Sequence, residues 1–289
     1  MPMPTGIGAI DLMLTIPDEN FAKAYEFMKP LLKDDESRGF KMPAQYMFKD
    51  IPEAGKQDDY IAYTLERMDA TGVDVAMIGV TEDYAISIEA LRKHPDRFIG
   101  YYEVDPSQGM KAVNQIRKMK EHFDIKCVTA FPAGCQPQVP INDKMFYPVY
   151  AACIDLDLPI GVCCGVPGPR VPMACQDVAL IDEVCWFFPE LKFIMKHGAE
   201  PWTDLAVKLM LKWPNLYYMT SAFAPKYYPK EIIHYANTRG ADKILYAGYF
   251  PMGLSLERIF REMPDVPFRD HVWPKFLREN AIRVLGLDL

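Results

Sequence analysis

Eight short apolar runs alternate with amphipathic segments along this chain, and this alternation limits the possible folds more than any other feature. Most runs are continuously apolar, as expected of parallel strands that are covered on both faces. The runs are IGAIDLML from Ile7, VDVAMIGV from Val73, RFIGYYEVD from Arg97, IKCVTAF from Ile125, PIGVCCG from Pro159, LKFIMKHG from Leu191, LYYMTSA from Leu216 and KILYAGYF from Lys243.

The segments between these runs have the spacing of amphipathic helices. Residues 58–71 place Ile61, Leu65 and Met68 on one face, and Gly72 follows as a stop signal. Similar segments cover 86–93, 110–122, 146–156, 178–187, 202–212 and 229–238, with closing helices at 255–261 and 273–285. The pattern predicts an α/β fold, a single (β/α)8 TIM barrel spanning residues 1–289. A doubly wound open sheet is the alternative, but its usual GxGxxG turn is not in the sequence.

A long connection over residues 16–57 follows the first run. Connections of this length are uncommon and often form lids or binding loops. This one leaves the carboxyl end of the first strand, where barrel enzymes carry their active sites. Its aromatic residues are Phe21, Tyr25, Phe27, Phe40, Tyr46 and Phe48. We expect it to cover a pocket or to form a contact between subunits.

The composition argues against several classes of protein. The 289 residues carry 32 basic and 39 acidic side chains, a net charge of −7, without the basic block that would favour nucleic acid. No stretch approaches the ~18 consecutive apolar residues of a membrane span, and the amino-terminal run lacks the basic region of a signal peptide. The seven cysteines lack CxxC spacing, which favours reduced thiols. We expect a cytoplasmic protein that binds a small molecule, with neither nucleic acid nor membrane as a partner.

The residues at the carboxyl ends of the predicted strands are the candidates for a functional site, because these ends meet at one face of a barrel. They are Met13, Thr15, Thr81, Glu82, Glu103, Asp105, Thr129, Phe131, Cys163, Cys164, His197, Glu200, Thr220, Ser221 and Tyr249. Of the five histidines, only His197 is among them. We interpret Glu103 and Asp105 as ordinary polar residues of the rim.

The order of several motifs resembles the amidohydrolase superfamily, in particular the amidohydrolase-2 branch of aromatic-acid decarboxylases, lactonases and related hydrolases. These motifs are MFYPVYAACIDLDLPIGV, FPELKFIMKHGAEPW, LYYMTSA, ILYAGYFPMG and the closing NAIRVLGL. AIDLMLT stands where the family has an Asp-x-His-x-His run, so Asp11 is kept, and we interpret it as structural. The resemblance implies a homo-oligomer or an assembly with a paralogous subunit.

The metal ligands of that family do not carry over to this sequence. By the resemblance, its strand-1 histidines fall on Met13 and Thr15, its strand-5 histidine on Cys163 and its strand-8 aspartate on Tyr249, while the strand-6 histidine is kept as His197. A catalytic zinc needs about three protein ligands, and Met and Thr are poor ones.

We therefore expect neither a metal nor another cofactor. The alternative is a relocated zinc site built from Cys163, Cys164, His197 and Glu200.

Three residues are the predicted catalytic groups, and each has a structural alternative. His197 suits general acid–base work, since an unperturbed histidine has a pKa of about 6.5, but it could be a structural histidine. Cys163 lies beside it on the neighbouring strand and could be a nucleophile, or a buried and inert pocket wall. The phenol of Tyr249 could donate a hydrogen bond to an oxyanion, or only fill space.

The predicted substrate-binding residues come from several segments. Arg170, in the rigid GVPGPRVPM, could clamp a carboxylate or lie exposed in its loop. In HGAEPW, Glu200 could orient His197, accept a proton or only stabilise a helix start, and Trp202 follows it. Met13 and Thr15 would line the site from the first strand.

These observations predict a hydrolase or a carbon–carbon lyase, including a decarboxylase, that acts without metal on a small cyclic or aromatic carboxylate. The alternative is a non-catalytic homologue that serves as a partner subunit of an active paralogue or as a ligand-binding protein.

Overall fold

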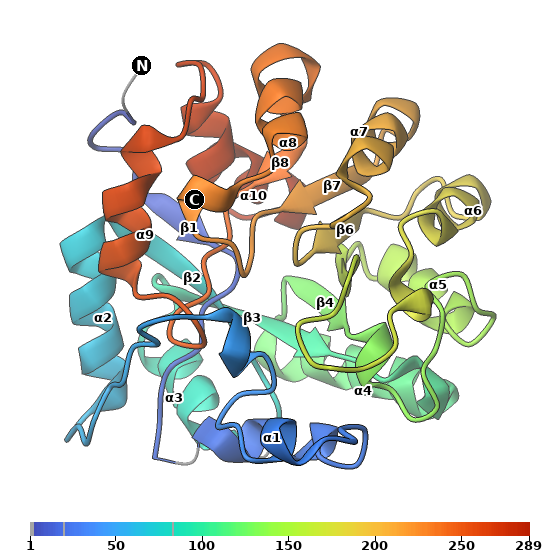
Figure 1. Ribbon diagram of the computed structural model, residues 1–289, viewed down its shortest axis with the longest axis horizontal. Coiled ribbons are helices and arrows are strands. Elements are labelled where there is room, and N and C mark those ends of the chain that lie inside the picture. The colour runs from blue at the N-terminus through green and yellow to red at the C-terminus, as the bar shows by residue number, and fades with distance from the viewer. Residues whose placement is uncertain (1–2, 20, 83) are drawn as a thin grey trace.

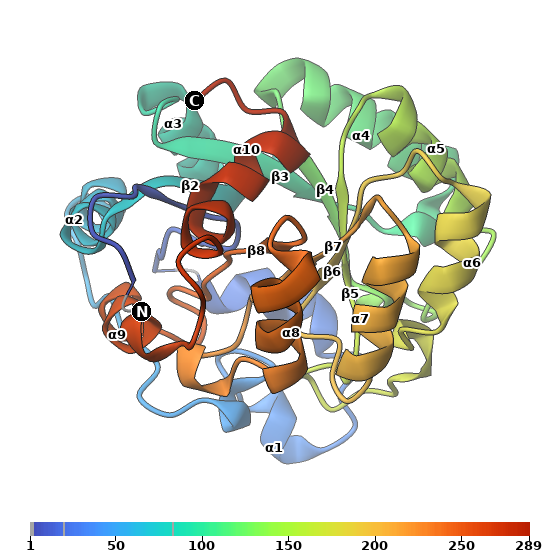
Figure 2. The same cartoon turned by 90° about the horizontal axis from the view of Figure 1, so that it is seen from above.

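The computed structural model describes residues 3–19, 21–82 and 84–289. Within them, eight parallel strands form one sheet in chain order. The strands are β1 Ala9–Asp11, β2 Val73–Gly79, β3 Phe98–Glu103, β4 Cys127–Ala130, β5 Ile160–Cys163, β6 Phe193–Lys196, β7 Leu216–Met219 and β8 Ile244–Leu245. Helices follow the strands (Figure 1) and surround them when viewed from above (Figure 2). The predicted TIM barrel is confirmed, and the doubly wound sheet is excluded.

The helices agree closely with the predicted segments. They are α2 Tyr60–Thr71, α3 Ala85–Lys93, α4 Met110–Phe123, α5 Tyr147–Asp155, α6 Leu180–Phe187, α7 Thr203–Lys212, α8 Lys230–Tyr235, α9 Leu256–Glu262 and α10 Asn280–Leu285. π-Helical turns at Ala236–Gly240 and Lys275–Glu279 extend α8 and precede α10. The Asp59 side chain caps the start of α2, and Gly72, with φ of 74°, ends it.

Alternate residues of the strands fill two apolar layers. The inner layer, in the barrel interior, includes Ile10, Met77 and Ile194, and the outer layer, between strands and helices, includes Phe193 and Met195. Because side chains alternate along a strand, Lys196 must follow Ile194 into the interior. The α10 residues Ala281, Val284 and Leu285 also belong to the inner layer, so this helix closes one end of the barrel.

The seam between β1 and the end of the sheet depends on Asp11. The carboxylate accepts hydrogen bonds from Gly248 N at 2.7 Å, Met13 N at 2.9 Å and the Tyr246 hydroxyl at 3.2 Å. Burial raises the pKa of Asp11 to about 6, against the lowering effect of these hydrogen bonds. Gly248 is required here, because a Cβ at this position would lie 2.5 Å from Asp11 Oδ2. The interpretation of Asp11 as structural fits this placement.

The eighth strand is shorter than predicted. The backbone N–H groups that would continue its ladder donate to side-chain oxygens instead. Ala247 N donates to Thr220 Oγ1 at 3.2 Å, and Gly248 N donates to Asp11. The two ends of the sheet still meet, since Leu12 N donates to Tyr246 O at 3.3 Å and a bridge joins Leu14 to Phe250.

The long connection after β1 contains short helical turns. They are the 3-10 turns Phe21–Met28 and Gln45–Met47 and the helix α1 Asp35–Arg38; α1 lies in blue at the lower edge of Figure 1. Among the described residues, none of the helices is both long and apolar enough to cross a membrane.

We predict that Asp11→Ala destabilises the fold by about 3 kcal/mol or more, because it leaves three buried donors without an acceptor. Asp11→Asn should retain most of the stability, since its amide oxygen still accepts the two backbone hydrogen bonds. Urea unfolding of both variants measures the difference; equal losses would contradict an acceptor role for Asp11.

Candidate active site at the carboxyl ends of the strands

A buried lysine lies at the centre of the carboxyl-end face. Lys196, the last residue of β6, is 2% exposed, and its register partner on β5 is Cys163. Its Nζ lies 3.6 Å from Glu103 Oε2 and 5.6 Å from the centre of the Tyr101 ring. Burial lowers the pKa of Lys196, but the ionised forms of Cys163, Glu103, Tyr101 and Tyr249 raise it above its usual value overall. Of these neighbours, the Glu103 carboxylate, 3.6 Å away, supplies the negative charge near neutrality. Lys196 therefore carries a fixed positive charge.

The other ionisable neighbours of this ammonium, apart from Glu103, are uncharged near neutrality. Burial raises the pKa of Cys163 to about 12, although Lys196 opposes the shift, so the thiol stays protonated near neutrality. Burial likewise raises the pKa of Tyr101 to about 12. Burial and the nearby Tyr249, Tyr101 and Glu103 raise the pKa of Tyr25 well above its usual range. Of its two predicted roles, Cys163 is better suited to a pocket wall than to a nucleophile.

His197 follows Lys196 in a strained turn. His197, Gly198 and Ala199 have φ of 66°, 96° and 58°, a conformation that costs energy for side chains with a Cβ. Gly198 cannot be replaced easily, because a Cβ there would lie 2.3 Å from the Phe223 ring. Such strain is often found at functional sites.

Ser221 orients His197 through its backbone N–H and its ring. Ser221 Oγ accepts from the His197 backbone N–H at 3.1 Å and lies 3.1 Å from Nδ1. The Ser221 hydroxyl can donate to Nδ1 or accept from it, according to which ring nitrogen carries the proton. Burial, assisted by the charge of Lys196, lowers the pKa of His197 well below its usual value, so the ring is neutral near pH 7.

Tyr249 contacts both His197 and the long connection. Its ring packs edge-on to His197 at 5.6 Å between centroids and stacks on Phe48 at 5.4 Å. Burial raises the pKa of Tyr249 despite the opposing effect of Lys196. The phenol therefore keeps its proton and can act as a hydrogen-bond donor.

The connection over residues 16–57 covers this face as a lid. Met42 and Ala44, 3% and 6% exposed, belong to the inner apolar layer together with Met13. Arg170, after β5, fastens the lid: its Nη1 lies 2.8 Å from both Asp34 Oδ1 and Glu36 Oε2.

Aromatic contacts reinforce this attachment. The Arg170 guanidinium lies 4.7 Å from the centre of the Tyr46 ring, and the Tyr46 hydroxyl donates to Gly168 O at 2.8 Å. Arg170 therefore has two carboxylate partners at the surface in this conformation, and its predicted role as a substrate clamp stays a prediction.

The other predicted substrate-binding residues, Thr15, Glu200 and Trp202, differ in their burial and packing. Thr15 is half-buried, and its N–H donates to Phe250 O at 2.9 Å. Glu200 is largely exposed. The partial burial of its carboxyl group, and then the charge of Glu231, raise its pKa. Trp202 packs against the outer apolar layer, away from the barrel interior. His197 and Tyr249 are in ring contact, Met13 belongs to the inner layer and Cys163 is paired with Lys196, whereas Trp202 packs against the outer layer.

The side chains at this face do not fit a metal ion of the family type. Over residues 3–19, 21–82 and 84–289, no three His, Cys, Asp or Glu side chains are grouped so that they could hold a metal. The Lys196 ammonium lies beside Cys163 and Glu103 and would repel a divalent cation. The alternative zinc constellation is not formed either, because Cys164 belongs to the outer layer whereas Cys163 faces the interior.

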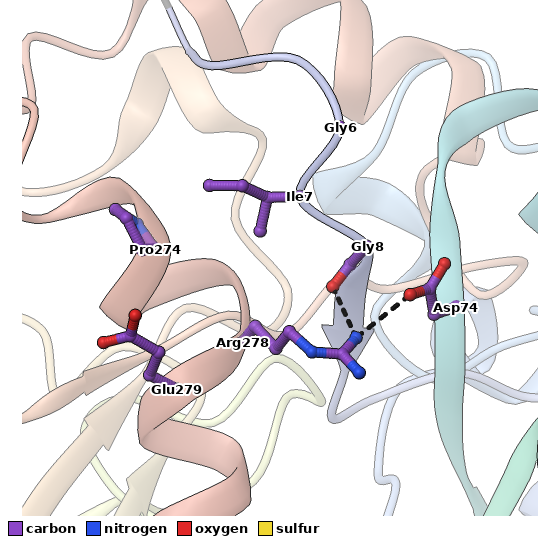
Figure 3. A pocket seen from close by; sticks show the side chains of 7 residues that line it. All are labelled: Gly6, Ile7, Gly8, Asp74, Pro274, Arg278 and Glu279. Carbon is purple, nitrogen blue, oxygen red and sulfur yellow. Dashed lines mark hydrogen bonds and ion pairs between the residues drawn. The ribbon is translucent and has the colours of Figure 1, made fainter. Parts of the chain in front are cut away.

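A cavity of about 380 Å³ lies at the amino ends of β1 and β2 (Figure 3). There, Arg278 Nη1 donates to Gly8 O at 2.9 Å and to Asp74 Oδ2 at 3.0 Å. In TIM barrels this end contributes to stability rather than to chemistry. We therefore assign these contacts to the fold.

A family model described as amidohydrolase matches residues 10–287. The chain belongs to this amidohydrolase family. Comparison with curated protein sequences gives no match.

Solved structures share the barrel of this chain. An uncharacterised TIM-barrel protein from Bordetella bronchiseptica is 21% identical, with a TM-score of 0.73 over 96% of this chain and 98% of its own. A 5-carboxyvanillate decarboxylase from Sphingomonas paucimobilis is 14% identical, with a TM-score of 0.70 over 98% and 100%. A 5-carboxyvanillate decarboxylase from Novosphingobium aromaticivorans, in complex with manganese and 4-hydroxy-3-methoxy-5-nitrobenzoic acid, is 16% identical, with a TM-score of 0.67 over 98% and 97%. At these identities the likeness shows the fold.

Lys196 was not among the site residues predicted from the sequence. The sequence does indicate its position: side chains alternate along a strand, so Lys196 points to the same face as the apolar Ile194. Glu103, interpreted as an ordinary rim residue, is its carboxylate partner.

We predict that the depressed pKa of His197 makes the fold less stable in acid. The unfolded chain takes up a proton on this histidine below about pH 6.5 while the folded state does not, so the free energy of unfolding falls as the pH drops. His197→Gln removes this contribution and should lose about 1 kcal/mol less than the wild type between pH 7.5 and 5.5. Urea unfolding at both pH values measures this, with His234→Gln, an exposed site on α8, as the control. Equal losses in wild type and His197→Gln would show that the folded state protonates normally.

We predict that Arg170→Met loosens the lid. Hydrogen–deuterium exchange of residues 34–48 should increase, because the two carboxylates and the Tyr46 ring lose their cation. Global stability should change by less than about 1 kcal/mol, since the ion pairs are exposed. Arg239→Met, at an exposed site, is the matched control. Unchanged exchange in this segment would rule out a fastening role.

Proposed function

We propose that this chain is an amidohydrolase-family enzyme that works without a metal and cleaves a carbon–carbon bond or hydrolyses a small aromatic or cyclic carboxylate. The observation that carries the proposal is the buried Lys196 ammonium, next to a neutral His197 and a protonated Tyr249, on the face where barrel enzymes do chemistry. A fixed cation with proton-bearing neighbours can stabilise negative charge without reorganisation. The decarboxylases among the structural neighbours support decarboxylation as the reaction.

Each residue has a defined task in this proposal. In a decarboxylation, the bond between the ring carbon and the carboxyl carbon breaks, carbon dioxide leaves, and a proton replaces it on the ring carbon. His197 would be the acid–base group: its neutral ring would take up a proton from solvent at its unprotonated nitrogen and pass that proton to the ring carbon. The Tyr249 phenol would donate a hydrogen bond to the developing negative charge, and Cys163 and Met13 would form the wall of the site.

The second candidate is a non-catalytic homologue that serves as a subunit of an assembly. An exposed aromatic pair on α6, Trp186 at 69% and Phe187 at 53%, favours it, because aromatic side chains are enriched at protein interfaces. Size-exclusion chromatography with light scattering tests whether the chain associates with itself.

Turnover of a panel of hydroxybenzoates and lactones tests the proposed function. We expect activity that survives a chelator, in protein whose metal content is far below one ion per chain. His197→Gln should lower kcat/KM by about 10²-fold or more, the typical size of an acid–base contribution. His234→Gln is the matched control and should keep full activity. Turnover that is lost with the chelator and restored by one metal would refute metal independence; binding without turnover would favour the non-catalytic homologue.

A further inference from the structure

The positive charge of Lys196 is poorly satisfied by the protein itself. A charge-assisted hydrogen bond between an ammonium and a carboxylate has a usual length of about 2.7–2.9 Å, whereas Glu103 Oε2 lies 3.6 Å from Nζ. The lysine side chain is 3% exposed and therefore has little water to replace the missing contacts. A buried charge that lacks close partners destabilises a fold.

The fold does not need a cation at this position. The preceding interior residue of the same strand is Ile194, and the interior around it is apolar. Replacing a buried ion pair by apolar residues of similar volume is often neutral or stabilising. The presence of the Lys196 ammonium in this interior therefore points to an anionic ligand that binds it.

Glu103 differs from Lys196 in its freedom to move. Its side chain is 40% exposed at the end of β3, and its other polar contact is with Thr129 Oγ1 at 3.5 Å. The carboxylate can therefore swing towards solvent when the lid opens, whereas the lysine is fixed in the interior.

We infer that Lys196 is the residue that binds the carboxylate of the substrate, and that Glu103 is an internal carboxylate which the substrate displaces. This inference rests on the proposed function, since it names the group that recognises its substrate. A single buried cation matches a monoanion, because a second negative charge would have no partner there. The rings of Tyr101 and Tyr249 on this face suit a flat aromatic group attached to the carboxylate.

Binding of benzoate and of its neutral analogue benzamide, measured by titration calorimetry, tests the inference. The wild-type protein should bind benzoate at least about tenfold more tightly than benzamide, since a hydrogen bond to a charged group contributes this much. Lys196→Met should lose this preference and keep or gain stability in urea. Glu103→Gln, which removes the competing carboxylate, should bind benzoate more tightly than the wild type.

Lys192→Met is the matched control, because Lys192 precedes the same strand and pairs with Asp157 at 2.8 Å. It should bind benzoate as the wild type does. Lys196→Arg keeps the charge and should retain the preference for benzoate. A Lys196→Met protein that is folded and still prefers benzoate would overturn the inference, as would weaker benzoate binding by Glu103→Gln.

The proposed function and this inference can fail separately. Benzoate binding that depends on Lys196, without turnover of any substrate in the panel, would refute catalysis and leave the anion site standing. Turnover that survives Lys196→Met with unchanged KM would refute the role of Lys196 and leave the proposed enzyme standing.

Discussion

The barrel depends on one buried carboxylate at its seam. Neighbouring strands elsewhere are joined by backbone ladders, but between β1 and β8 the backbone donor of Gly248 turns to Asp11. Asp11 also accepts from Met13, so one side chain fixes both the end of β1 and the turn that carries Tyr249. The geometry of the candidate site therefore follows from the way the sheet closes, and the same aspartate that opens the family's metal motif has a purely structural task here.

In the proposed function, the charge of Lys196 takes the place of the charge that a metal ion would supply. A divalent ion needs several converging donors, while an ammonium needs only a strand position that faces the interior. Lys196 provides that position, and its charge in turn disfavours protonation of the adjacent His197. A cation next to a neutral imidazole forms a site that can bind an anion and accept a proton.

The sequence predicted the architecture well because continuous apolar runs and helix stops are local signals. It placed His197, Cys163 and Tyr249 near one another because strand ends converge in a barrel, and the structure puts His197 in contact with Tyr249. Lys196 was missed because a lysine at the end of an apolar run usually marks the solvent-exposed end of a strand. The attachment of Arg170 to Asp34 joins positions 136 residues apart, and nothing in local patterning encodes such a pairing.

Two arginines lie near opposite ends of the barrel, and their binding partners differ in rigidity. Arg278 is bound by Gly8 and Asp74 at the amino end, where both partners belong to the rigid sheet. Arg170 is bound at the other end by residues of the lid, whose exposed ion pairs are weak enough to break. The lid residues Met42 and Ala44 pack with the inner apolar layer at the barrel mouth. Arg170 is thus placed to hold the lid closed over the face that carries the buried cation.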